Sequence, residues 1–324
     1  IEETKEYMNH ASLRVIPSES GLIFDICIRV YSGSDSAAAR IVDYHTNVVM
    51  VKKNEDYLIN REITGRTESS MADQSLLTVK DICEFAETVD IDDVREVLDR
   101  QISYNMAIAQ EGMKHSYGAN IGKVLLDIYG DSDVKIRAKA MAAAGSDARM
   151  NGCELPVVIC SGSGNQGMTA SVPVIIYAQE LGSTQEDLYR ALVVSNLSTL
   201  HIKQGIGRLS AYCGAVGAGC GAGAGIAWLH GGRYEEIAHT LVNGLAIISG
   251  TICDGAKASC AAKIASSVDA GILGYFMYKE GQQFRGGDGI VKKGVENTIR
   301  SVGILASEGM QETDREIVRI MIGE

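Results

Sequence analysis

The chain has 324 residues, of which 46% are hydrophobic and 22% charged, as is typical of a globular protein with a large core. Its formal net charge of −11 argues against nucleic acid or an anionic membrane surface as a main partner. Eight cysteines are too few for a disulfide framework in a chain of this length, and no signal peptide is recognisable, so we expect reduced thiols and a cytoplasmic location.

The first 68 residues predict a small α+β domain. Residues 1–10 have the composition of a helix end, and the segment that follows alternates apolar and polar side chains as antiparallel strands do. The clearest alternation places Phe24, Ile26, Ile28 and Val30 on one face of a strand. We expect two strand pairs, at residues 13–16 with 22–30 and at residues 39–42 with 47–51. So small a sheet is marginal by itself and needs something to pack on.

From residue 69 to 324 the spacing of apolar residues predicts a large helical bundle domain. Val94, Leu98 and Ile102 recur at helical intervals behind the acidic pair at 92–93, which suits a helix N-terminus. We expect further helices near residues 119–130, 132–148, 167–181, 185–200, 233–249, 255–275 and 291–302. The fold class that follows is mainly α, with a small antiparallel α+β domain at the N-terminal end.

Residues 210–230 form an uncharged stretch long enough to cross a bilayer. The stretch is mostly glycine and alanine, so its transfer into lipid would be poor. We therefore expect a small-residue helix that is buried against other helices.

A glycine-rich segment, CSGSGNQGM at residues 160–168, follows an apolar run and precedes a predicted helix. Its glycines allow close approach of the backbone to a ligand, and amides at a helix N-terminus favour an anion. Because no GK[ST] ends the segment, a substrate carboxylate is a better candidate than a polyphosphate; an ordinary glycine-rich connection is the alternative. The substrate-binding candidates are Ser161, Gly162, Ser163, Asn165 and Gln166.

Three further polar residues are candidates for chemistry. Lys203 could neutralise a carboxylate or act as a base if desolvated, and Arg208 could clamp a carboxylate bidentately. The alternative for both is a solvated helix end. His45 is a second catalytic candidate, as a hydrogen-bonding or pH-sensitive group, although a lone histidine is usually structural.

Three cysteines, Cys213, Cys253 and Cys260, are the candidate metal ligands. Thiolates suit a soft metal or an iron–sulfur cluster, although no CxxC pair is present. The remaining cysteines are expected to be small buried hydrophobic residues. These are Cys27, Cys83, Cys153, Cys160 and Cys220.

Four motifs together resemble one family. They are HTN at 45–47, SGSGNQG at 161–167, HIKQGIGRLSAYCG at 201–214 and ICDGAKASC at 252–260. These motifs are similar to those of the L-cysteine desulfidases, which are related to the α-subunit of iron–sulfur serine dehydratases. The likeness extends from about residue 11 to the end of the chain.

The resemblance implies an amino-acid-degrading lyase that needs no pyridoxal phosphate. It implies a [4Fe–4S] cluster on Cys213, Cys253 and Cys260 with the fourth iron open, and a substrate carboxylate held by the 161–167 loop and Lys203. The expected reaction converts L-cysteine to pyruvate, ammonia and sulfide. L-serine, with water as the third product, is the alternative substrate. The expected partner is a small-molecule amino acid, without nucleic acid or membrane, and a homodimer is an assembly to test.

The sequence departs from this family in one respect. Members that resemble it carry an N-terminal segment with a GCTEP-like motif, whose cysteine is thought to serve at the active site, and residues 1–324 contain no such motif. We therefore expect the site in this chain to be incomplete and its cluster to be at risk of loss. Two non-enzymatic alternatives stay open. One is a metal- or amino-acid-binding protein with structural zinc, which prefers four ligands where only three are evident. The other is a helical core without a cofactor.

Overall fold

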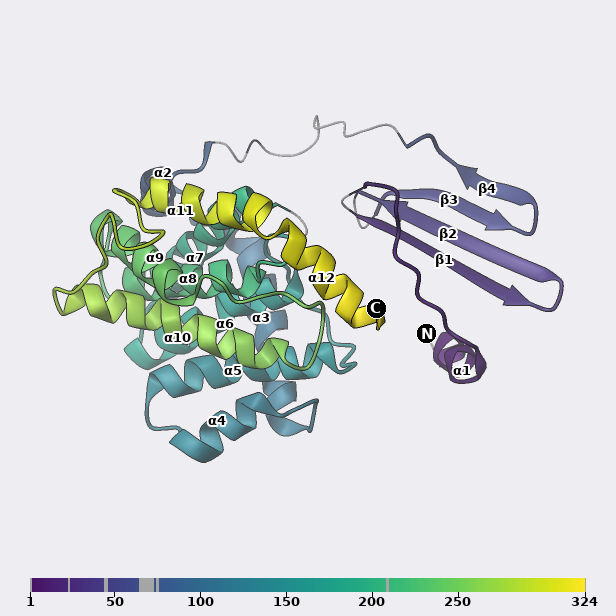
Figure 1. The fold of residues 1–324 in the computed structure, drawn as a ribbon. Coiled ribbons are helices and arrows are strands. Elements are labelled where there is room, and N and C mark those ends of the chain that lie inside the picture. The colour runs from purple at the N-terminus through teal and green to yellow at the C-terminus, as the bar shows by residue number, and fades with distance from the viewer. Residues whose placement is uncertain are drawn as a thin grey trace. The chain divides into compact units, whose positions relative to one another are not determined.

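The structure is a computed structural model, and it shows a predominantly helical chain with one small antiparallel sheet (Figure 1). It describes residues 2–22, 24–43, 46–63, 73, 76–207 and 210–323. The chain divides into two compact units, Ile1–Ala72 with Arg315–Glu324, and Asp73–Asp314. The predicted fold class is confirmed. The predicted domain boundary between residues 68 and 69 lies outside the described residues.

The first unit contains a helix and a four-stranded antiparallel sheet in the order β1-β2-β3-β4. Its elements are α1 (Glu2–His10), β1 (Asp25–Ser32), β2 (Asp35–Val42), β3 (Val48–Lys53) and β4 (Asp56–Asn60). Two-residue turns join β1 to β2 and β3 to β4. Gly33 and Asn54 take left-handed backbone conformations there, with φ of 58° and 52°. Both residue types adopt this conformation readily, so the sequence suits tight hairpins.

One strand prediction is wrong. Residues 13–16 do not form a strand, and β1 pairs instead with β2 in the register Asp25↔Val42 to Ser32↔Asp35. Among the residues that the structure describes, the other edge of β1 stays open, and residues 13–16 do not pair with it because their apolar side chains have nothing to pack on: Leu13 is 77% and Val15 72% exposed. Asp25 also accepts two hydrogen bonds from Arg40 of β2, at 2.8 and 2.7 Å, and this contact lowers the pKa of Asp25.

The other features of the sheet follow the prediction more closely. Ile26, Ile28 and Val30 share one face of β1, and they remain exposed, Ile28 by 62%. Both segments of the second predicted pair are strands, within β2 and β3, whereas β4 was not predicted.

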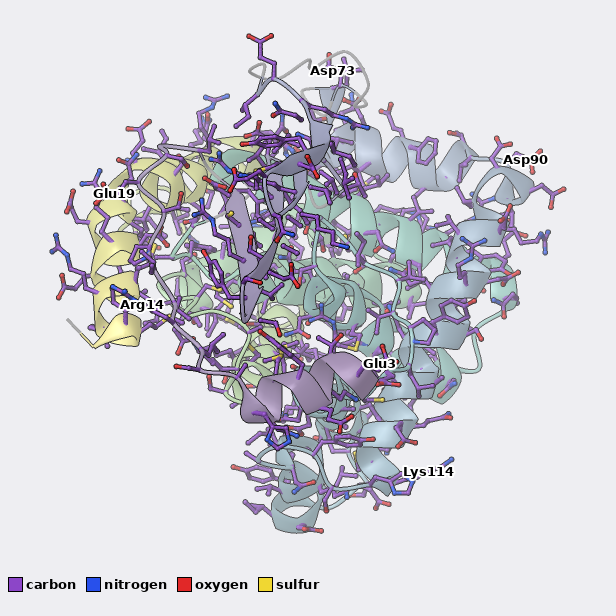
Figure 2. All side chains as sticks on the ribbon, turned by 90° about the vertical axis from the view of Figure 1, so that its right-hand side faces the viewer. Glu3, Arg14, Glu19, Asp73, Asp90 and Lys114 are labelled. Carbon is purple, nitrogen blue, oxygen red and sulfur yellow. The ribbon has the colours of Figure 1, made fainter. Side chains whose placement is uncertain are left out.

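The helical unit is built from long helices, some of which have a capping side chain at the start. They are α2 (Val79–Thr88), α3 (Ile91–Lys114), α4 (Ile121–Tyr129), α5 (Val134–Met150), α6 (Gly164–Leu181), α7 (Gln185–Ile206), α8 (Gly214–Leu229), α9 (Tyr234–Ile248), α10 (Cys260–Lys279), α11 (Val295–Ile304), the π-helical turn η3 (Leu305–Gly309) and the start of α12 (Gln311–Ile322). Side chains of Thr78, Asp90, Asp133 and Thr184 cap the starts of α2, α3, α5 and α7. Figure 2 labels Asp90 and Lys114 at the two ends of α3.

Helix α8 lies inside this unit, packed against α6, α7, α9 and α10 (Figure 1). All of its residues from Ala215 to Trp228 are buried, which confirms the prediction of a buried small-residue helix. No helix in the described part of the chain is long and apolar enough to span a membrane. The predicted helices are present, but α10 starts at Cys260 rather than at residue 255, because the chain turns at Gly255 with a φ of 88°.

Two rows of glycine, Gly219 with Gly223 and Gly221 with Gly225, let neighbouring helices approach α8 closely. A Cβ added at Gly219 or Gly223 would meet the backbone of α10, at Ser267 and Gly271 respectively. A Cβ at Gly221 would meet the backbone of α7 at Ser195, 2.6 Å from its carbonyl oxygen. Spacing by four residues puts each row on one helix face, so α8 touches α7 and α10 backbone to backbone.

Candidate active site

Three helices of this unit start at the sequence motifs. The residues that precede α6, α8 and α10 are Ser163, Cys213 and Ser259, and none of them makes a side-chain capping hydrogen bond. The first amides of a helix have no partner within the helix, and its N-terminus carries partial positive charge. Contacts between the three starts, described below, bring these amides to one region that suits anionic groups.

The glycine-rich segment is a tight turn. Cys160 and Ser163 exchange two backbone hydrogen bonds, of 3.2 and 3.1 Å. Between them, Ser161 and Gly162 both take left-handed conformations, with φ of 48° and 90°. That conformation is unusual for serine and costs about 1–2 kcal/mol. The Ser161 hydroxyl donates a hydrogen bond to Oε1 of Gln166, which ties the turn to the first turn of α6.

Two side chains from the first turn of α6 reach neighbouring helices. Gln166 is buried and fills the space beside Gly214 at the start of α8, where a Cβ would overlap its amide. Asn165 accepts a hydrogen bond of 3.3 Å from Nη1 of Arg149, near the end of α5. The glycine-rich turn is therefore connected both to Cys213 and to a cation that was not predicted.

A short backbone pairing brings two distant cysteines together. The Cys213 amide donates to the Thr251 carbonyl at 3.0 Å, and the Cys253 amide donates to the Ala211 carbonyl at 2.6 Å. The thiols of Cys213 and Cys253 then lie within hydrogen-bonding contact. The hydrogen bond from Cys213 lowers the pKa of Cys253 to about 6, whereas the same contact, together with burial, raises the pKa of Cys213. Of the two thiols, Cys253 is therefore the one that loses its proton more readily.

Lys203, in the last turn of α7, lies close to this thiol pair. Burial lowers the pKa of its ammonium, and the charges of Cys253 and Cys213 oppose that shift. A desolvated lysine beside thiolates has the properties of a proton acceptor that can work near neutral pH.

Cys260, the first residue of α10, belongs to the same region. Its sulfur hydrogen bonds with the backbone of residues 255–257 at 3.5 Å. Lys263, one turn further along α10, forms an ion pair with Asp254, and its charge interacts with Cys213, Cys253 and Cys260. One ammonium therefore faces all three predicted ligands.

The donors fit an iron–sulfur cluster by their chemistry. Three thiols share one lysine counter-charge, and sulfur is the ligand that such clusters take. Their present positions are different from those of ligands. Cys213 and Cys253 contact each other, and among the described residues no three His, Cys, Asp or Glu side chains are placed to hold one metal ion. Binding at all three thiols requires this contact to open.

The remaining site predictions have separate outcomes. His45 and Arg208 lie outside the described residues. Of the cysteines expected to be packing residues, Cys83, Cys160 and Cys220 are buried and Cys153 is partly buried. For Cys27 the prediction is wrong: it is exposed, because it lies on β1, whose side chains are largely uncovered. Arg149 and Lys263 were missed, since no sequence motif marks either residue.

Comparison with known proteins gives one family. The family model for the serine dehydratase alpha chain matches residues 15–319. A UPF0597 protein of Desulfitobacterium hafniense is 61% identical over 323 residues, which cover 100% of this chain and 75% of that protein. A UPF0597 protein of Lachnoclostridium phytofermentans is 51% identical over 322 residues, covering 99% and 77%. One of Treponema denticola is 45% identical over 293 residues, covering 89% and 68%.

Proposed function

The chain belongs to the serine dehydratase alpha-chain family, and from this premise we propose that it is an iron–sulfur-dependent β-eliminating lyase that converts L-cysteine to pyruvate, ammonia and sulfide. The observation that carries the proposal is the meeting of three thiols, a half-buried lysine and the glycine-rich turn in one region. The family's name makes L-serine the second candidate substrate, by the same elimination with water as the leaving group.

The ligands in this proposal are Cys213, Cys253 and Cys260. When bound there, a [4Fe–4S] cluster would supply an open iron, a Lewis acid that is soft enough to accept a thiolate leaving group. Lys263 offsets the negative charge that thiolates bring, and its ion pair with Asp254 fixes the loop that joins Cys253 to Cys260.

The chain's own residues would bind the substrate and move its proton. The amides at the start of α6 and the turn at Ser161 bind the substrate carboxylate. Lys203, whose pKa burial lowers, accepts the α-proton at Nζ. Loss of the β-substituent as sulfide then leaves aminoacrylate, which tautomerises and takes up water to give pyruvate and ammonia.

Metal analysis and product analysis test the proposal together. Protein purified without oxygen should contain roughly four iron and four acid-labile sulfide per chain. L-cysteine should yield equal amounts of pyruvate and sulfide, and the rate with L-serine decides between the two substrates. Cys253→Ser should lose iron and turnover, while Cys220→Ser, a buried cysteine of α8, should keep both.

Two results would contradict the proposal. One is a protein that carries its cluster and forms pyruvate from neither amino acid. The other is stoichiometric zinc in place of iron, which would favour a structural metal site in a non-catalytic protein.

A further inference from the structure

Helix α5 carries a cation, Arg149, in its last turn, and a glycine of α6 leaves room for its side chain. Its sequence is rich in alanine, and its buried face includes Ala140, Ala144 and Ala148. Arg149 follows and is half-buried against α6. A Cβ added at Gly164 would lie 2.5 Å from Nε of Arg149, so the guanidinium occupies the space that a larger residue at 164 would take.

Few acceptors and no carboxylate among the described residues contact the Arg149 guanidinium. Its one hydrogen bond in the described part of the chain goes to the amide oxygen of Asn165 at 3.3 Å, and it forms no ion pair with a carboxylate there. Burial lowers the pKa of Arg149, and only the thiol of Cys260 opposes the shift. Arginine stays charged in proteins, and a partly buried charge without a partner costs free energy.

Arg137, on the same helix, shows the ordinary arrangement. Its side chain is 28% exposed, forms an ion pair with Glu180 and donates to the Asp131 carbonyl at 2.5 Å. Arg149 keeps most of its five donors unused beside the glycine-rich turn. A planar fork of that kind binds a carboxylate through two parallel hydrogen bonds.

We infer that Arg149 binds the α-carboxylate of the amino-acid substrate and makes the site selective for free α-amino acids over their amides. Gly164 provides the space for the guanidinium, and Asn165 orients it. The inference rests on the proposed function, because it identifies which part of the substrate this end of the site recognises. It adds a charged partner for the carboxylate to the amides at the start of α6, and Lys203 remains the proton acceptor.

Binding of two unreactive ligands tests the inference without turnover. L-alanine has the α-carboxylate and ammonium of the substrate but no leaving group, and L-alaninamide lacks the negative charge. Titration calorimetry should show that the unsubstituted protein binds L-alanine more tightly than L-alaninamide. Arg149→Gln should weaken L-alanine binding by about tenfold to hundredfold, the range for a hydrogen bond to a charged group, and should abolish the preference. Arg149→Lys, which keeps the charge without the fork, should be intermediate.

Arg137→Gln is the matched control, since it makes the same exchange on the same helix, and it should bind L-alanine normally. The iron content tests whether Arg149 acts instead by stabilising the proposed ligand Cys260. It should be unchanged in Arg149→Gln. Circular dichroism checks folding, and if the glutamine variant is unfolded, the lysine variant decides.

An unchanged affinity or an unchanged preference in the folded Arg149 variants would overturn the inference. So would an unsubstituted protein that binds both ligands equally or binds neither. Product formation from L-cysteine or L-serine is measured separately. If the protein turns over substrate and the Arg149 variants bind L-alanine normally, only this inference is refuted. If binding is selective for the carboxylate but no product forms, only the proposed lyase activity is refuted.

Discussion

The contact between α8 and α10 leads to a sharp prediction about two glycines of the same helix. A Cβ at Gly223 would lie 2.6 Å from the carbonyl carbon of Gly271, which belongs to the backbone of α10. A Cβ at Gly217 would lie 3.0 Å from Cγ2 of Ile202, a side-chain methyl that needs to move by only a few tenths of an ångström. The same substitution, glycine to alanine, therefore meets backbone at one position and, at a longer distance, a side-chain methyl at the other.

The magnitudes follow from two opposing effects. Alanine favours the helix over glycine by about 1 kcal/mol at either position. Overpacking costs about 1–3 kcal/mol, and a clash between two backbones belongs at the upper end of that range because only separation of the helices relieves it. Gly223→Ala should therefore lower the free energy of unfolding by about 2 kcal/mol, while Gly217→Ala should change it by less than about 0.5 kcal/mol.

Urea denaturation followed by far-UV circular dichroism measures both variants. The iron content of protein purified without oxygen gives a second measurement, because Cys213 precedes α8 and Cys260 starts α10. Separation of these helices in Gly223→Ala should reduce iron retention as well as stability. Equal stability of the two variants would refute the close approach of α8 to α10.

Three other predictions concern the same unit. Asp147 is buried and accepts a hydrogen bond from the Gly122 amide at 3.0 Å, and burial raises its pKa from 3.8 to about 6. Below pH 4 the neutral carboxyl is compatible with burial, and the stability it contributes is lost as the pH rises from about 4 to 6. Denaturation at a series of pH values should therefore show that the free energy of unfolding of the unsubstituted protein falls by up to about 3 kcal/mol relative to that of Asp147→Asn. Glu296→Ala removes the 2.7 Å partner of the buried His201 ring and should cost about 2 kcal/mol in urea denaturation, whereas a loss within error would contradict a structural role for this pair. Ser161→Gly relieves about 1 kcal/mol of left-handed strain but removes a hydroxyl of the turn, so the KM for substrate should rise while stability is kept.

The helices could be predicted from sequence because their signals are local. Apolar spacing located them, and the glycine and alanine composition of residues 210–230 correctly indicated a buried helix. The sheet was harder, since alternation over four residues at 13–16 resembles a strand whether or not a partner exists. The turn at Gly33 pairs β1 with β2, whereas the proline and glycine at 17–21 indicated a hairpin that does not form.

The candidate site was predictable only where its residues stand in motifs. Cysteines and a glycine-rich turn can be recognised in a sequence by residue type alone. The structure brings four of these residues into one region, namely Ser161, Gln166, Cys213 and Cys253. Arg149 gave no such signal, because its position depends on α5 packing against α6, and a single arginine after an alanine-rich helix is indistinguishable from a solvated helix end.

The electrostatics of the region would allow a chain with a net charge of −11 to bind the carboxylate of the proposed substrate. Thiolates and a carboxylate would bring negative charge to one place, where the cations Arg149 and Lys263 lie and where Lys203 is the proposed base. The uncapped starts of α6, α8 and α10 add partial positive charge, so Cys213 occupies a position where serine or aspartate would normally cap the helix. Backbone contact along one glycine row of α8 holds the starts of α8 and α10 together, so the packing of this helix matters for the proposed site as well as for stability.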